Sequence, residues 1–297
     1  MTERQKVIVI VGPTASGKSA LAVEIARQFS GEVISADSRQ VYKGLDIGTG
    51  KITKREMKKI PHYLLDVVHP KKIFTAYDFT RHARRACTNI LQNGKVPIIC
   101  GGTGFYIDVL LGRISLPDVS ANMKLRAHLE KKSTSELYRM LKKLDPRRAR
   151  VTDRHNPVRL VRALEIAKSD HKTTILTTHT GYESFWIGLQ PDAVTLRKKI
   201  HLRLLERMRA GMVQEAKRLH VSGLSWKRME ALGLEYRHLA LYLQKKISKE
   251  AMLRELEARI WHYAKRQITY WKRNKDITWF APSNKKDIVR KVKDFLG

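Results

Sequence analysis

The chain has 297 residues, of which 59 are Lys or Arg and 28 are Asp or Glu, so its formal net charge at pH 7 is +31. This length accommodates one large domain or two modest ones, and the charge favours a polyanionic partner, above all nucleic acid, over a lysine excess that serves only solubility. The two cysteines, Cys87 and Cys100, lie far apart without a C-x-x-C pattern. This argues against a disulfide framework or a structural zinc site and fits a reducing compartment.

The N-terminal residues 1–6 are polar and lead directly into a short apolar run. That run is too short for a signal peptide, and no other run reaches the length of a membrane span. We therefore expect a cytoplasmic protein with no membrane segment, and a monomer as the default state.

A strand, a glycine-rich loop and a helix open the chain. Residues 7–11 are all β-branched, as in a buried strand, and residues 20–26 have helical composition. Between them, Gly12-Pro13-Thr14-Ala15-Ser16-Gly17-Lys18-Ser19 matches G-x-x-x-x-G-K-[ST]. In this context the loop directs backbone N–H groups at a phosphate chain, Lys18 adds a positive charge, and the Ser19 hydroxyl is a ligand for Mg²⁺.

A second strand is expected over 32–36, followed by Asp37-Ser38-Arg39-Gln40. Strands that alternate with helices indicate a parallel α/β sheet, whose ligands bind beyond the carboxyl ends of the strands. Asp37 is therefore expected at the same edge as the phosphate loop. From the residues alone, its carboxylate could bind Mg²⁺, act as a general base or cap a turn.

Further strands are expected over 62–67 and 96–100, with a helix over 77–93 between them. The strand over 96–100 leads into Gly101-Gly102-Thr103. In a phosphate-loop ATPase this position commonly holds an aspartate for magnesium. Its absence makes hydrolysis a weaker interpretation and leaves the Thr103 hydroxyl at the end of the strand.

A change in composition near residue 113 predicts a small helical insertion over 114–182, set into a core made of 1–113 and 183–297. Between 124 and 162, Lys and Arg outnumber Asp and Glu by 13 to 4. Apolar spacing predicts helices in this segment. Asp145-Pro146 breaks one of them, Asn156-Pro157 begins another, and a polar loop follows over 169–180. We expect this insertion to present a basic face, with a merely solvated surface as the alternative.

The remaining chain is expected to return to the sheet over 185–189 and then to form helices over about 193–210, 229–243 and 248–273. A strand over 276–280 and a helix over 284–296 would close it. In the third of these helices, Trp261, Ala264, Ile268 and Trp271 share one face, which favours core packing over a platform for stacked bases. Tyr263 and Tyr270 lie on another face, and their role stays open.

Three interpretations fit these residues. The chain could be a kinase or NTPase that acts on or beside nucleic acid. It could be a group transferase whose loop holds a diphosphate leaving group. It could also be a non-catalytic RNA-binding protein that uses a nucleotide as a switch.

Five blocks of sequence together resemble the bacterial tRNA dimethylallyltransferases, also called tRNA isopentenyltransferases. They are Gly-Pro-Thr-Ala-Ser-Gly-Lys-Ser at 12–19, Ser-Ala-Asp-Ser-Arg-Gln-Val-Tyr-Lys-Gly-Leu-Asp-Ile-Gly-Thr at 35–49, Gly-Gly-Thr-Gly-Phe-Tyr at 101–106, Asn-Pro-Val-Arg-Leu-Val-Arg-Ala-Leu-Glu at 156–165 and Ala-Lys-Arg-Gln-Ile-Thr-Tyr-Trp at 264–271. The phosphate loop is generic, whereas Ala-Asp-Ser-x-x-Val-Tyr-Lys-Gly is highly specific. The blocks occur in the family's order and extend nearly end to end.

The resemblance implies a phosphate-loop NTPase-like parallel sheet flanked by helices, and transfer of a dimethylallyl group from dimethylallyl diphosphate to N6 of the adenosine 3′-adjacent to the anticodon. It implies that Asp37 is the general base, that Gly12 to Ser19 bind the diphosphate, and that Ser19 holds Mg²⁺. Arg203, in the family's R-x₇-G pattern ending at Gly211, would contact the diphosphate, and Thr103 would orient the reacting centre.

The resemblance also implies contacts with the anticodon stem-loop of tRNA. The residues so implied are Asp37, Ser38, Arg39, Gln40, Thr103, Arg126, Val158, Arg159, Leu160, Val161, Arg162, Gly233 and Arg237. The segment Ala231 to Arg237 is longer than the family's Gly-Tyr-Lys/Arg form, which leaves Glu235 and Tyr236 as alternatives to Arg237. The zinc-finger extension of eukaryotic relatives is absent, so recognition would fall to the insertion and the core.

Overall fold

The computed structural model describes residues 5–117, 119, 121–169 and 181–297. Within them, residues up to 113 and from 181 onward form one compact unit, the core unit, and residues from 114 to 169 form a second, the helical unit. The expected polar loop lies almost wholly outside the described residues.

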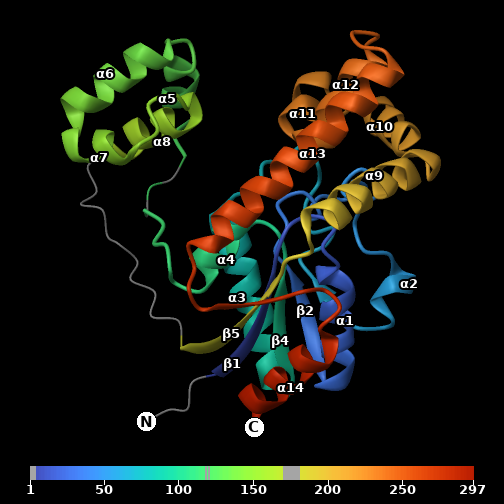
Figure 1. Ribbon diagram of the computed structural model, residues 1–297. Helices are drawn as coiled ribbons and strands as arrows, with labels where there is room; N and C mark the ends of the chain where they lie inside the picture. Colours follow the sequence, from blue (N-terminus) through green and yellow to red (C-terminus); the bar gives the residue numbers. More distant parts are fainter. Residues whose placement is uncertain (1–4, 118, 120, 170–180) are drawn as a thin grey trace. The chain divides into compact units, whose positions relative to one another are not determined.

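The core unit is built on a six-stranded sheet in which every neighbouring pair of strands is parallel, in the order β3-β2-β4-β1-β5-β6 (Figure 1). Its strands are β1 (Gln5–Val11), β2 (Gly31–Ser35), β3 (His62–Tyr63), β4 (Val96–Cys100), β5 (Tyr182–Leu189) and β6 (Ile277–Phe280). Its helices are α1 (Lys18–Gln28), α2 (Lys54–Met57), α3 (Ala76–Gln92), α4 (Gly104–Leu110), α9 (Ala193–Arg209), α10 (Met212–Val221), α11 (Trp226–Ala231), α12 (Leu234–Leu243), α13 (Lys249–Lys272) and α14 (Lys285–Leu296). The predicted α/β class with a parallel sheet flanked by helices is confirmed.

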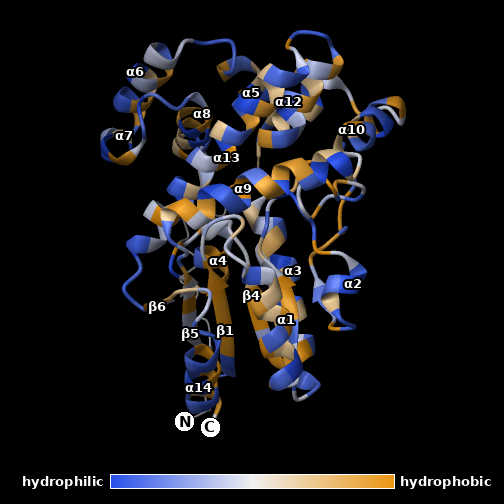
Figure 2. Cartoon of the chain, turned by 45° about the vertical axis from the view of Figure 1, so that its right-hand side comes forward, coloured by the Kyte–Doolittle hydropathy of each residue, from blue (hydrophilic) through white to orange (hydrophobic). Residues whose placement is uncertain are grey.

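The strand β1 shows why the sheet is covered on both faces. Val7, Val9 and Val11 point into one apolar cluster, which α3, α4 and the end of α13 complete. Ile8 and Ile10 point into another, to which α1 and α14 contribute. Alternate side chains of a strand face opposite sides, so a run of β-branched residues is buried on both. Figure 2 shows these hydrophobic strands in orange between helices that carry both hydrophilic and hydrophobic residues.

A third apolar cluster joins the helices α9 to α13 to one another and to the loop after β2. Leu204 and Met252 are examples from the helices, and Val41 and Leu45 come from the loop. The predicted core stripe of α13 is confirmed: Ala264 and Trp271 are buried, and Trp261 and Ile268 are half-buried against this cluster. These helices therefore hold the loop after β2 at the carboxyl edge of the sheet.

Three predicted elements of the core unit are wrong in extent. The strand expected over 62–67 stops at Tyr63, because Leu64 and Asp66 adopt positive φ angles of 63° and 55° that end an extended strand. The helix expected over 229–243 is broken at Gly233, which has a φ of 80°, and α10 was not predicted as a separate helix. The predicted start of the returning strand at 185 is also late, since Tyr182 already pairs with Gln5.

The helical unit consists of α5 (Met123–Leu129), α6 (Thr134–Leu144), α7 (Pro146–Val151) and α8 (Pro157–Ala167). The helix boundaries predicted at Asp145-Pro146 and Asn156-Pro157 are present. The side chains of Asp145 and Asn156 accept hydrogen bonds from backbone N–H groups at the starts of α7 and α8. Leucines of α5, α6 and α8 form its own apolar core.

Candidate active site

The phosphate loop connects β1 to α1 in the way that its sequence requires. Gly12 has a φ of 144°, and a Cβ at this position would lie 2.5 Å from the carbonyl oxygen of Leu189 on β5, so only glycine fits. Gly17, with a φ of 95°, directly precedes α1 and offers no side chain to cap it. The first-turn N–H groups of this helix therefore remain available to an anion.

Lys18 lies within this loop, where its ammonium donates a hydrogen bond to the carbonyl oxygen of Pro13 at 2.5 Å. Burial lowers the pKa of Lys18 to about 8. Ser19, the next residue, is exposed. The loop thus places a poorly solvated ammonium and an accessible hydroxyl together at a helix N-terminus, which suits a phosphate group.

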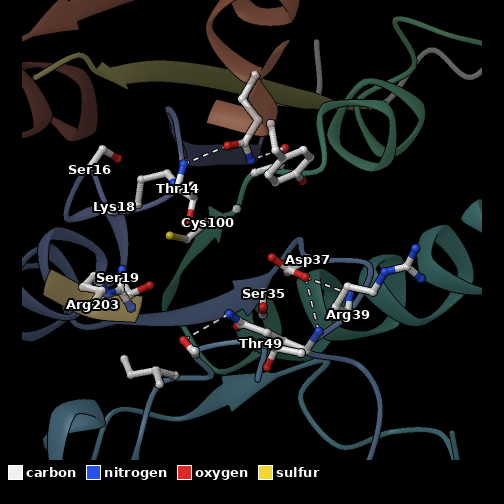
Figure 3. Close-up of a pocket in the computed structure, with 18 of the residues that line it drawn as sticks. Thr14, Ser16, Lys18, Ser19, Ser35, Asp37, Arg39, Thr49, Cys100 and Arg203 are labelled. Atoms are coloured by element: carbon white, nitrogen blue, oxygen red, sulfur yellow. Dashed lines mark hydrogen bonds between the residues drawn. The ribbon is translucent and has the colours of Figure 1, made fainter. Parts of the chain in front are cut away.

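Asp37 follows β2 and uses one carboxylate oxygen to cap its own turn. Its Oδ1 accepts hydrogen bonds from the backbone N–H groups of Arg39 at 2.7 Å and Gln40 at 3.2 Å, which Figure 3 draws as dashed lines. No hydrogen bond within the described part of the chain uses its Oδ2. The turn cap and a chemical role are therefore compatible, since each would employ a different oxygen.

Thr103 begins α4 and supports the segment around Asp37 from the neighbouring strand end. Its N–H donates to the carbonyl oxygen of Ala36 at 3.1 Å, and its Oγ1 accepts from the N–H of Ser38 at 3.0 Å. Gly101 and Gly102 line the cavity described next, whereas Thr103 is not among its lining residues. The structure therefore places Thr103 as a support for Asp37 rather than in the cavity wall.

The phosphate loop and Asp37 open into one cavity of about 570 Å³, all of whose lining residues belong to the core unit. Figure 3 shows a close-up of a pocket with side chains of both loops, together with Arg203 and Cys100. Of the predicted site residues, those that line the cavity are Thr14, Ala15, Ser16, Gly17, Lys18, Ser19, Asp37, Ser38, Arg39, Gln40, Arg203 and Gly233. Gly12 and Pro13 belong to the loop but do not line the cavity.

Arg203 reaches this cavity from α9. Burial, and then the neighbouring guanidinium of Arg207, lower its pKa. A Cβ at Gly50 would lie 3.4 Å from Nη2 of Arg203, so the backbone of that loop stands directly beside the guanidinium. Arg203 and Lys18 thus place two positive charges on the same cavity, which favours the binding of a multiply charged anion.

Four residues of α13 line the cavity, and sequence reasoning assigned none of them to the site: Ile260, Tyr263, Arg266 and Gln267. Gln267 accepts a hydrogen bond from the N–H of Thr14 at 2.7 Å and donates one to the carbonyl oxygen of Gly102 at 3.1 Å, so it ties the phosphate loop to the end of β4. Tyr263 and Arg266 also line the cavity, with the guanidinium 5.8 Å from the ring centroid. Arg266 and Gln267 lie in the motif block at 264–271, but nothing local indicates which of its side chains face the cavity.

The three candidate contact residues after Gly233 differ in their surroundings. Tyr236 is buried and donates to Glu215 at 2.6 Å. Glu235 pairs with Arg207 at 3.0 Å and lines the cavity. Arg237 is exposed on α12 but is not a lining residue of the cavity. A contact between Arg237 and a large partner would therefore lie outside the cavity.

The helical unit divides its predicted contact residues into two groups. Val158 and Arg159 are exposed, whereas Leu160 and Val161 are 0% and 6% exposed in the unit's own apolar core. The side chains of Leu160 and Val161 therefore offer little surface to a partner, and their contact with tRNA stays a prediction. A surface on α8 would use Val158 and Arg159 instead.

Arg126 and Arg162 both pair with the buried carboxylate of Glu165. Arg126 donates through Nε at 3.0 Å and Nη2 at 2.9 Å, and Arg162 donates through Nη1. Although burial acts to raise the pKa of Glu165, these hydrogen bonds hold it at about 2. The two guanidiniums are thus fixed in place, and each keeps part of its surface exposed.

The chain has many relatives among known proteins. The family model described as IPP transferase matches residues 40–274. The chain is 38% identical to tRNA dimethylallyltransferase 1 of Syntrophus aciditrophicus over 98% of this chain and 99% of that protein, and 40% identical to tRNA dimethylallyltransferase 2 of Treponema denticola over 92% and 93%.

Solved structures agree with this result. A tRNA isopentenylpyrophosphate transferase from Bacillus halodurans superposes with a TM-score of 0.75 at 32% identity, over 99% of this chain and 97% of that one. A eukaryotic dimethylallyltransferase shares the fold, with a TM-score of 0.83 at 24% identity, over 98% of this chain and 79% of that one. Among the described residues, no helix is both long and apolar enough to cross a membrane. Sequence and fold together show that the chain belongs to the IPP transferase family.

Proposed function

We propose that the protein transfers a dimethylallyl group from dimethylallyl diphosphate to N6 of the adenosine 3′-adjacent to the anticodon in tRNA, with release of pyrophosphate. The observation that carries this proposal is a single cavity lined by both the phosphate loop and Asp37. A prenyl donor held by its diphosphate can there meet an acceptor amine beside a carboxylate. The family and the printed names of the relatives point to the same reaction.

The donor end is formed by the phosphate loop. The N–H groups at the start of α1, the ammonium of Lys18 and the guanidinium of Arg203 would neutralise the negative charge that develops as pyrophosphate departs. Gln267 holds the amide of Thr14 in place, so this part of the loop is fixed before the donor binds. A preorganised anion site of this kind lowers the barrier because it need not rearrange during the reaction.

The acceptor end is formed around Asp37. The exocyclic amine of adenine is a poor nucleophile, because its lone pair is delocalised into the ring, so a base must take its proton as the carbon–nitrogen bond forms. Oδ2 of Asp37 is the oxygen left for this purpose, because Oδ1 caps the turn. Thr103 acts through the Ser38 amide and keeps this turn in position.

The adenosine must leave the stack of the anticodon loop to enter the cavity, at a cost of a few kcal/mol. Tyr263 places an aromatic ring in the cavity wall, and Gly233 and Arg266 line the same cavity. Aromatic rings are the surfaces on which unstacked bases bind. We assign this part of the cavity to the nucleobase.

Magnesium fits the site through Ser19. Its hydroxyl is exposed and lines the cavity, and the described residues hold no cluster of three or more His, Cys, Asp or Glu side chains that would bind a metal alone. An ion there would therefore share its ligands between Ser19, the diphosphate and water. When bound, Mg²⁺ supplies charge that stabilises the departing pyrophosphate.

Each unit by itself offers residues that would contact the tRNA. Ser38, Arg39, Gln40 and Gly233 lie at the cavity, and Arg237 is exposed nearby on α12. In the helical unit, Val158 and Arg159 are exposed, and Glu165 orients Arg126 and Arg162. Guanidiniums held in this way suit phosphate oxygens. A cytoplasmic monomer remains our prediction.

The test is to incubate the protein with labelled dimethylallyl diphosphate, Mg²⁺ and tRNA in the absence of ATP. We expect label in the RNA and release of pyrophosphate. The matched control is a tRNA with guanosine in place of the adenosine 3′-adjacent to the anticodon, which should remain unlabelled. ATP consumption or phosphoryl transfer without labelled RNA would support the kinase interpretation and refute this one.

A further inference from the structure

Glu215 is a buried carboxylate outside the cavity that no step above uses. It lies on α10, is 4% exposed, and does not appear among the residues that line the cavity. A buried carboxylate is costly unless charge-assisted hydrogen bonds satisfy it.

The partners of Glu215 come from the loop after β2. Its Oε2 accepts hydrogen bonds from the backbone N–H groups of Asp46 at 3.0 Å and Ile47 at 2.8 Å, and its Oε1 accepts one from Gly48 at 2.9 Å. The hydroxyl of Tyr236 also donates to Oε1 at 2.6 Å. All four donors are uncharged, so the carboxylate acts as the anion around which three consecutive amides converge.

This loop continues directly into the wall of the cavity. Thr49 and Gly50 are lining residues, and the backbone at Gly50 stands beside the guanidinium of Arg203. Arg207 also reaches the loop, since its Nη1 donates to the carbonyl oxygen of Gly48 at 2.8 Å. The position of residues 46–50 therefore determines how closely the wall approaches Arg203.

Tyr236 extends the arrangement to a second wall. Its ring packs so closely on Gly48 that a Cβ there would lie 2.6 Å from the ring. Tyr236 belongs to α12, and Gly233, Leu234 and Glu235 at the start of this helix line the cavity. One carboxylate thus joins the loop beside Arg203 to the segment that begins α12.

We propose that Glu215 is a positioning residue for the donor site: it holds residues 46–50 against Arg203 and so sets the affinity for the diphosphate of the prenyl donor. This inference rests on the proposed function for the identity of the donor. Glu215 itself touches no substrate. Its effect passes through the loop, and it should appear in donor binding more than in tRNA binding.

The test is Glu215→Gln, which keeps the shape of the side chain but replaces one acceptor oxygen with an NH₂ group. Whichever oxygen is replaced, at least one backbone N–H of residues 46–48 loses its acceptor. We expect the Kd for dimethylallyl diphosphate, measured by calorimetry, and its KM to rise about tenfold, which is the loss of roughly one hydrogen bond. The Kd for tRNA and kcat at saturating donor should stay within twofold.

The matched control is Tyr236→Phe, which removes one donor and leaves the three amides on the carboxylate. It should lower the unfolding temperature with less than a twofold change in donor Kd. Glu215→Asp retains the charge with a shorter side chain and should give an intermediate donor Kd, which provides a measurement if the glutamine variant does not fold.

A folded Glu215→Gln protein with normal donor affinity would overturn the proposal. So would a folded Glu215→Gln protein that binds donor and tRNA equally more weakly than wild type does. So would a normal donor Kd for Glu215→Asp if the glutamine variant does not fold. Transfer by the wild-type protein tests the proposed function separately. Absence of labelled RNA from wild type would refute that function, whereas the ratio of variant to wild-type donor Kd judges Glu215.

Discussion

The substitution Asp37→Asn separates the two roles that the structure gives to this side chain. An asparagine keeps Oδ1 as the acceptor for the N–H groups of Arg39 and Gln40, so the turn persists. It replaces Oδ2 with an NH₂ group, which has no basicity. General-base catalysis contributes about 10²–10⁴-fold in rate, so the transfer rate should fall about 10³-fold. The unfolding temperature should not change, and tRNA affinity should stay within a few-fold.

The companion variant Asp37→Ala removes the turn cap as well. Two backbone N–H groups then lose their acceptor, which costs about 1–3 kcal/mol of folding free energy where they are shielded from water. Transfer is measured in a single turnover with saturating tRNA and labelled donor, beside thermal unfolding of each variant. The control is Asp294→Asn, an exposed carboxylate on α14. If Asp37→Asn transfers within tenfold of wild type, Asp37 is only a turn cap and the proposed chemistry is wrong.

Three further predictions concern charge. Burial lowers the pKa of Lys18 to about 8, and Lys18 should bind the diphosphate in its ammonium form. Donor binding should therefore weaken, and its Kd rise, as pH rises above about 8. Lys18→Ala should weaken donor binding at neutral pH and abolish its dependence on pH. An unaltered pH profile of donor binding would contradict the role of the Lys18 ammonium. Arg159→Glu should weaken tRNA binding most at low salt, whereas the same reversal at exposed Lys286 should not; equal binding at every salt concentration would leave Arg159 as a solvated side chain. Glu165 has a pKa held at about 2 by its arginines, so its stabilising effect is present above its ordinary pKa of 4.5 and is lost as pH falls towards 2. Glu165→Gln should remove that acid-dependent loss from the unfolding of the helical unit, and an unchanged acid profile would show that the ion pairs do not stabilise it.

The sheet was predictable because its signals are local. Residues 7–11 are β-branched and buried on both faces, and the residues that follow match a phosphate loop whose glycines the backbone requires. Where the backbone departs from regular angles, the prediction failed. Leu64 and Asp66 take positive φ values although neither is glycine, and an apolar pattern contains no signal for that.

From the residues alone, the site was predictable where sequence order determines spatial position, and the family resemblance added Arg203 and Gly233. The phosphate loop and Asp37 each follow a strand of a parallel sheet, so both had to appear at its carboxyl edge. Gln267 is 253 residues from Thr14 in sequence, and its contact depends on how α13 packs. The same reason explains Leu160 and Val161: a motif block marks a helix, but its tertiary packing decides which of its residues reach the surface.

Hydrogen bonds at the carboxyl edge of the sheet hold the walls of the cavity together within the core unit. Gln267 links the phosphate loop to the end of β4, and Thr103 links the start of α4 to the segment after β2. Every residue that lines the cavity belongs to the core unit. Charge changes on α8 should therefore alter the Kd for tRNA and leave the Kd for dimethylallyl diphosphate unchanged. Changes at Gln267 should do the reverse, because its amide holds the loop that binds the donor.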